Sequence, residues 1–286
     1  MAKERRQPPA QPPAEPAGPV ARWIGPLRRL PGWSSQHPLR AGLVAGGLLV
    51  AMIGLGAAAA LVFRVPDEQD REELLAQALE ALDLHDFRQA RHLALQMGDA
   101  KSLPYGDQAG PLLIHGAVTA HEAEGQTDPT KRRVLYLVAA RYLEEARSHG
   151  WPQGQEPRGL VLLGRALHHS GRYGESLPIL REALAADPAS APQLHWLLTD
   201  SHLQSSPPRL DAALTHNREY LASPELTAHE RHRGQLLQGD ILLRQGQFEA
   251  AYVAAGEVPE TASHHPDSVV LQGRVALAAL AKSQPL

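Results

Sequence analysis

Apolar side chains recur every three or four residues along the chain, from about residue 67 to its end. The first of these runs consists of Leu74, Leu75, Ala78, Leu79 and Leu82. This spacing is the period of one face of an α-helix, whereas a half-buried strand would alternate every second residue. Proline and glycine fall between the runs, where helices end. The pattern therefore predicts an all-α body over residues 64–286.

Residues 159–188 contain the clearest pair of helices. Leu163 and Gly164 lie on a predicted first helix, and Gly171 and Tyr173 mark a tight turn. The second helix carries a stripe of small and apolar residues, namely Ser176, Leu180 and Ala183, and ends at Asp187-Pro188. Two helices joined by so short a turn are expected to pack against each other as a hairpin.

A small residue recurs on the first helix of each predicted hairpin. These residues are Ala78, Gly116, Gly164, Thr199, Gly239 and Gly273, at spacings of 38, 48, 35, 40 and 34. The matching residues on the other second helices are Phe87, Ala90, Ala94, Ala139, Leu143, Ala146, Ala213, Tyr220, Phe248, Ala251 and Ala255. The spacing predicts about five hairpin units and a last segment that begins another unit. About ten extra residues, 124–133, are expected between the helices of the second unit.

Small residues that face each other let two helices approach closely, and we expect Gly164 to pair with Ser176 and Gly239 with Ala251. The remaining packing residues of these two units are Leu180, Ala183 and Phe248. The units resemble tetratricopeptide repeats, whose period is about 34 residues. The resemblance implies a helical solenoid that binds other proteins, and the layout of the chain is similar to that of membrane-anchored bacterial members of the family.

In such solenoids the first helices line a concave groove. The resemblance places eight residues there as candidate partner contacts: Val161, Arg165, His168, His169, Trp196, Asp200, Asp240 and Arg244. Trp196 has two interpretations, an exposed anchor for a peptide or a side chain packed between units. The Lys and Asn residues with which some co-chaperone members hold a peptide carboxylate are missing at matching places, so that activity is not implied.

The N-terminal 63 residues differ from the body. Residues 1–40 are rich in proline and arginine and predict a disordered tail. Residues 41–63 carry no charge, and 23 residues in a helix span roughly 34 Å, enough for a bilayer core. They predict a single transmembrane helix; a cleaved signal peptide is the alternative. Gly42 and Gly46 lie four residues apart, as in the seams of membrane-helix dimers, so a homodimer is one possible state.

The charges are divided across this apolar segment. Residues 1–40 hold seven basic and two acidic side chains, whereas residues 64–286 hold 21 basic and 29 acidic ones. Because basic residues stay on the cytoplasmic side of a span, the N-terminus is expected in the cytoplasm and the body outside it. An acidic body argues against a nucleic-acid partner, which would select a basic surface.

Catalytic chemistry has little support in the sequence. There is no cysteine, and none of the common phosphate-binding loops or nucleophile elbows is present. The best histidine groups among the fifteen are His168-His169, His229 with His232, and His264-His265, and they lie in different units. Since zinc needs three or four converging ligands, no metal, cofactor or catalysis is expected.

The sequence therefore predicts a membrane-anchored scaffold or chaperone-like adaptor in the cell envelope, with protein or peptide partners. Two alternatives remain open. One is a metal-dependent hydrolase that uses clustered histidines. The other is a self-assembling structural membrane protein, which would use the glycine-rich span and the apolar last segment.

Overall fold

The computed structural model describes residues 67–283. They belong to one compact unit. The predicted tail, the predicted membrane span over residues 41–63 and its Gly42–Gly46 seam all lie outside the described residues. Within residues 67–283, no helix combines the length and the apolarity that crossing a bilayer requires.

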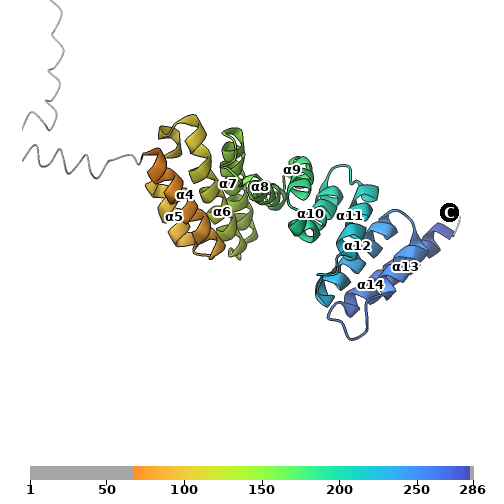
Figure 1. The fold of residues 1–286 in the computed structure, drawn as a ribbon. Helices are drawn as coiled ribbons and strands as arrows, with labels where there is room; N and C mark the ends of the chain where they lie inside the picture. The colour runs from red at the N-terminus through yellow and green to blue at the C-terminus, as the bar shows by residue number, and fades with distance from the viewer. Residues whose placement is uncertain (1–66, 284–286) are drawn as a thin grey trace, which may run out of the picture. The chain divides into compact units, whose positions relative to one another are not determined.

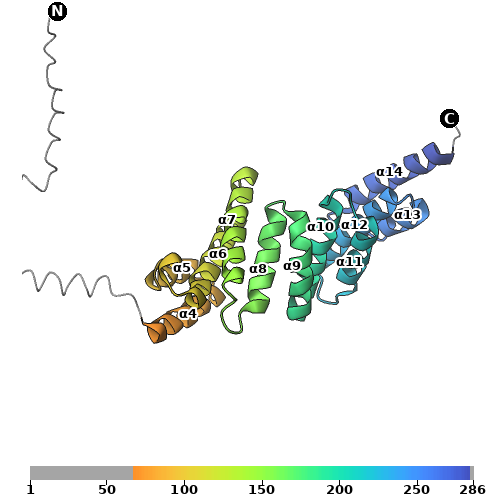
Figure 2. The same ribbon diagram turned by 90° about the horizontal axis from the view of Figure 1, so that it is seen from above.

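The described part is all-helical and holds no strand, which confirms the all-α part of the predicted fold class. Its helices are α4 (Glu68–Asp83), α5 (Phe87–Gln96), α6 (Ala109–Glu124), α7 (Pro129–Ser148), α8 (Glu156–His169), α9 (Tyr173–Ala186), α10 (Ala191–Gln204), α11 (Leu210–Ala222), α12 (Ala228–Arg244), α13 (Phe248–Gly256) and α14 (His265–Ser283). Three short 3-10 turns, Ala100–Ser102, Tyr105–Gln108 and Pro188–Ser190, lie in the connections. Figures 1 and 2 show the helices following one another in chain order.

Each helix packs mainly against its neighbours in the chain. The pairs α4/α5, α6/α7, α8/α9, α10/α11 and α12/α13 form five hairpins, and each hairpin stacks on the next. The last helix, α14, packs on α13 and α12. The second hairpin differs from the expectation: only residues 125–128 join its helices, and residues 129–133 belong to α7, which has 20 residues. Asp128 caps α7 by accepting from the Thr130 and Lys131 N–H groups, so the helix begins early.

Three hairpins close through the same turn. In the third, the Arg172 N–H donates to the Leu167 carbonyl and Gly171 has a φ of 85°. In the fifth, the Gln247 N–H donates to the Leu242 carbonyl and Gly246 has a φ of 75°. This is the Schellman arrangement, in which a left-handed residue ends the helix.

The first hairpin uses the same turn with a histidine. The Asp86 N–H donates to the Ala81 carbonyl, and His85 takes the left-handed position with a φ of 59°. An aromatic residue, Phe87, begins the second helix two residues later, as Tyr173 and Phe248 do in the other two hairpins. The same backbone turn thus closes the hairpin in alternate units.

The buried side chains form three clusters along the array. The N-terminal core lies within α4, α5 and α6 and includes Met97 and Ile114. The central core runs from α6 to α10 and includes Leu143 and Leu198. The C-terminal core begins at Leu203 in α10 and continues through α14. Because α10 contributes to both the central and the C-terminal core, the fourth hairpin joins the two.

Glycines allow the helices of a hairpin to approach. A Cβ on Gly116 would lie 2.5 Å from Cγ of Leu143, and one on Gly164 would lie 2.6 Å from Cδ2 of Leu180. The close neighbour of Gly164 is therefore Leu180, not Ser176. A Cβ on Gly239 would meet Leu271 of α14 at 2.8 Å and the Ala251 carbonyl at 3.3 Å. Gly273 in α14 has open space around it.

The other predicted packing residues lie inside the hairpins. Ser176, Leu180, Ala183 and Ala251 are fully buried, whereas Phe248 is partly buried against the C-terminal core. A leucine in one helix thus fills the space left by a glycine in its partner, which fixes the distance between the two backbones.

Candidate protein-interaction surface

The first helices of successive hairpins are tied to each other by side-chain contacts. Arg165 of α8 pairs with Glu124 of α6, and Nε2 of His168 lies 3.2 Å from Oδ2 of Asp200 in α10. Farther along, the Arg233 guanidinium of α12 lies 4.0 Å from the ring centroid of Trp196 in α10. Between the last two first helices, Arg274 of α14 lies 3.3 Å from Asp240 of α12. We call this row of contacts the ladder.

His168 is the most buried member of the ladder, with 6% of its surface exposed. Its Nδ1 lies 2.9 Å from Oγ of Ser201, and Oγ of Ser201 lies 2.9 Å from Oγ of Ser176 in α9. Because a carboxylate only accepts, the His168 Nε2–H must donate to Asp200. Aspartate, histidine and serine therefore form one chain of polar contacts across α8, α9 and α10.

Aspartate, histidine and serine also occur together in the active sites of hydrolases, but the burial of Ser201 excludes catalysis by this cluster. Ser201 is completely buried, so no substrate can reach its hydroxyl. A nucleophile must contact the bond that it attacks. The contacts satisfy buried polar groups and hold three helices together, which is a structural role.

Asp200 lies at the edge of the same cluster, half-buried. Burial by itself would raise the pKa of its carboxyl group. The hydrogen bond and charge of His168, the hydrogen bond from Gln204 and the charge of Arg233 outweigh this and lower the pKa overall. The carboxylate of Asp200 is thus ionised, and it already interacts with neighbours inside the chain.

Trp196 is packed between units. Its ring is tilted against Tyr220 of α11 with centroids 5.4 Å apart, Arg233 covers it, and it contacts the central core. Of the two interpretations of Trp196, these contacts favour packing over an exposed anchor.

The remaining predicted groove residues do not form one continuous site. Val161 is half-buried against the central core. Oδ2 of Asp240 accepts from Nε of Arg244 at 2.8 Å, one helical turn away. The ring of His169 tilts against Tyr136 of α7 with centroids 4.7 Å apart. Desolvation, followed by the charges of His168 and Arg165, lowers the pKa of His169 to about 4.

The histidines do not assemble a metal site within residues 67–283, where no group of three or more histidine, aspartate or glutamate side chains is placed to hold an ion. The rings of His168 and His169 meet edge to face at 4.8 Å, and His229 of α12 contacts His264 before α14 at 4.4 Å. These arrangements are ring contacts, which differ from converging ligands.

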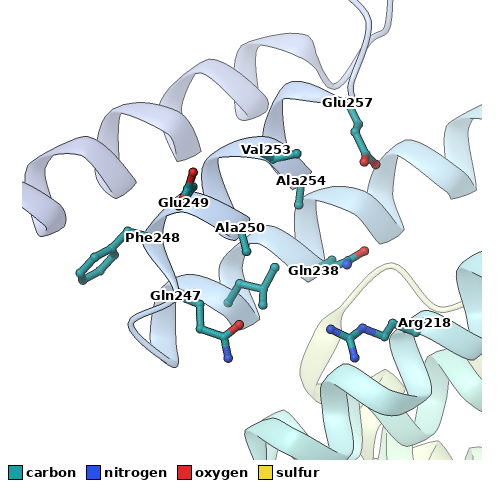
Figure 3. A pocket seen from close by; sticks show the side chains of 10 residues that line it. Arg218, Gln238, Gln247, Phe248, Glu249, Ala250, Val253, Ala254 and Glu257 are labelled. Atoms are coloured by element: carbon teal, nitrogen blue, oxygen red, sulfur yellow. The ribbon is translucent and has the colours of Figure 1, made fainter.

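A groove that the sequence did not indicate lies between α11 and α13. It has a volume of about 550 Å³ and is lined by Arg218, Gln238, Leu242, Gln247, Phe248, Glu249, Ala250, Val253, Ala254 and Glu257. Figure 3 shows Arg218 on one side, Ala250, Val253 and Ala254 on the other, and Gln238 between them. Val253 is 58% exposed. The apolar run Ala250–Ala255 was a usable signal, because α13 cannot bury an apolar residue on every face.

A second groove occupies the corresponding place between α5 and α7. It has a volume of about 790 Å³, with Leu112 and His115 of α6 between the two helices. Leu95 of α5 and Val138 of α7 border it and are exposed. Exposed apolar side chains thus border both grooves on the second helices α5, α7 and α13, and a further group, Val269, Val270, Leu277 and Leu280, lies on α14. The ladder on the first helices engages its own neighbours.

Compared with protein-family models and with curated proteins, the chain matches none.

Proposed function

We propose that residues 67–283 are a tetratricopeptide-type scaffold that binds other proteins and carries out no catalysis of its own. The observation that carries this proposal is the stack of five helix hairpins in chain order. Two further features support it: the glycine–leucine contacts inside hairpins and the turn shared by alternate hairpins. Such arrays offer long surfaces to partners because each unit contacts only its neighbours.

The groove of Figure 3 is the surface that we assign to a partner. Neither Arg218 of α11 nor Glu249 of α13 forms an ion pair among residues 67–283, and exposed apolar atoms of Ala250 and Val253 lie between them. An amphipathic helix fits this surface. Its apolar side would cover Val253, an acidic side chain would face Arg218, and a basic one would face Glu249.

We also propose that residues 41–63 anchor the scaffold in the cell membrane, with the N-terminus in the cytoplasm. The uncharged length of this segment and the seven basic residues before it support this orientation. An anchor raises the local concentration of whatever the scaffold binds at the membrane.

The test is photo-crosslinking of the full chain in its native membrane. A photoreactive amino acid is introduced at Ala250 or Val253 in the groove, at Arg244 on the first helices, or at the exposed Gln89 of α5 as a control. We expect Ala250 and Val253 to capture the same protein, and Gln89 not to capture it. The captured segment should be helical and should bind the purified chain directly.

A substitution then tests the surface. V253E should weaken direct binding of the captured partner at least tenfold, because it places a charge where the apolar side of the helix lies. The matched variant Q89E should leave binding unchanged. Capture only from Arg244 would assign the partner to the first helices instead. If only further copies of the chain were captured, the protein would be self-assembling, and the proposal of a scaffold for other proteins would be wrong.

A further inference from the structure

Three histidine rings meet inside the fourth hairpin. His195 and His202 lie on α10, and His216 lies on α11. The Nδ1 atoms of His195 and His216 are 3.2 Å apart, and the rings of His202 and His216 stack at 5.6 Å with an interplanar angle of 9°. The two facing nitrogens supply at most two metal ligands, fewer than a zinc site requires. Metal binding therefore does not explain why the three histidines lie together.

His202 is the critical member of this cluster. Only 1% of its surface is exposed, and neither ring nitrogen has a hydrogen-bond partner within the described part of the chain. A buried polar group without a partner is costly, and the cost is much larger when the group is charged. The fold therefore holds this ring neutral, and adding a proton works against the packing.

The surrounding charges oppose protonation more than they favour it. Arg181 of α9 acts on His202 and His216, and Arg209, which precedes α11, acts on His202. The acidic group that acts on the cluster is Glu219 of α11, which favours the charged forms of His195 and His216. A protonated His202 would face two arginines and the other rings.

The cluster lies where two cores meet. Leu194 and Leu198 of α10 belong to the central core, whereas Leu203 of α10 and Leu214 of α11 belong to the C-terminal core. His195 and His202 lie beside these two groups along the same helix. Loss of packing in α10 and α11 would disconnect the two cores without breaking either one.

We infer that the fourth hairpin is an acid-sensitive joint, in which proton uptake by the rings of His195, His202 and His216 loosens α10 and α11 and uncouples the two cores. The inference does not depend on the proposed binding function. With such a joint, a fall in pH would change the relative positions of the two grooves, which lie on either side of the fourth hairpin's α10.

The direction of the pH effect follows from burial. Desolvation is the main cause that lowers the pKa of all three rings, and for His202 the pKa falls to about 4. An opened hairpin exposes the rings to water, where a histidine has a pKa of about 6.5. The opened state therefore binds more protons in acid. The stabilising effect is complete above about pH 6.5 and is lost as the pH falls toward 4.

The experiment is amide hydrogen exchange of the full chain, read by mass spectrometry of peptides at pH 7.5 and pH 5.0 and corrected for intrinsic rates. The shift of His202 alone predicts that the opening constant of α10 and α11 rises roughly thirtyfold between these pH values. Peptides from α4, which carries no histidine and lies far from the fourth hairpin in the stack, should change little. An equal rise in α4 and in α10 would contradict a local joint.

The H202L variant tests the mechanism. Leucine keeps an apolar side chain in the site and cannot take up a proton, so most of the rise in α10 should disappear. H92Q changes an exposed histidine of α5 and should leave the rise intact. Both variants retain His169, so any response of α8 is the same in each. A full rise in H202L would overturn the inference.

A second measurement is independent of folding in the variant. An NMR titration of the histidine Cε1–H signals in the native chain should show His202 neutral down to pH 5. If the signal of His202 titrated near pH 6.5 with the hairpin closed, the ring would tolerate its charge. The buried ring on which the inference depends would then not oppose protonation, and the inference would be wrong.

Discussion

Nε2 of His168 in α8 lies 3.2 Å from the carboxylate of Asp200 in α10, and this contact joins two neighbouring hairpins. The opposite nitrogen of the ring contacts the buried hydroxyl of Ser201. Such a contact affects stability mainly because its removal leaves buried polar groups without a partner. A buried donor or acceptor without a partner costs more than an average hydrogen bond contributes.

H168L should therefore lower the free energy of unfolding by about 1–3 kcal/mol, because the buried Ser201 hydroxyl and the half-buried Asp200 carboxylate each lose their contact with the ring. Urea unfolding of the full chain, followed by circular dichroism, measures the loss. R244A removes an exposed contact with Asp240 and should cost less than about 1 kcal/mol. Equal losses in the two variants would mean that His168 is no more than a surface contact.

The glycine at the centre of the third hairpin gives a second prediction. G164A places a methyl group 2.6 Å from Cδ2 of Leu180, which is fully buried and cannot swing away. Overpacking of this kind typically costs about 1–3 kcal/mol. The matched change G273A adds the same methyl group to α14 in open space, where alanine favours a helix by up to about 1 kcal/mol. Denaturation midpoints of the two variants should move in opposite directions.

The shared turn gives a third prediction. His85 takes the left-handed position that Gly171 and Gly246 occupy in the other two turns, and such a conformation strains a residue with a Cβ. H85G should raise the free energy of unfolding by about 0.5–1 kcal/mol. G171A should lower it, because the new Cβ would also lie 2.7 Å from the Arg133 guanidinium. Thermal unfolding measured at one pH compares the two variants; a destabilised H85G would show that the contacts of the His85 ring outweigh the strain.

The orientation of the chain in the membrane gives a fourth prediction. A reporter that is active only outside the cytoplasm, fused after Leu286, should be active in whole cells, because the basic residues precede the apolar segment. The same reporter fused before Met1 should be inactive. Activity of the N-terminal fusion alone would reverse the proposed orientation.

The helices could be predicted from the sequence because their signals are local. Each helix shows its own apolar periodicity, and a small residue recurs on the first helix of each hairpin at a spacing of 34 to 48 residues. The structure has helices at these places. The start of α7 was missed although Asp128-Pro129 is a strong start signal, since a cap followed by proline opens a helix.

The candidate surface was harder to predict because it depends on how hairpins lie against each other. The contact of Arg233 with Trp196 joins residues 37 positions apart, and nothing local in the sequence selects that pair. The same holds for the groove between Arg218 and Val253, which exists because α12 separates α11 from α13. Periodicity identifies which residues face outward, whereas stacking decides which outward residues meet.

The turn at His85, Gly171 and Gly246 has a consequence for how the chain acquires its structure. In each of these turns a local backbone hydrogen bond closes the end of the first helix and reverses the chain, so the hairpin forms from contacts between residues near in sequence. The second and fourth hairpins lack this turn. We therefore expect the first, third and fifth hairpins to form early, and the two between them to order on surfaces that already exist. Folding would then proceed from three starting points, and interfaces would be completed in the gaps between them.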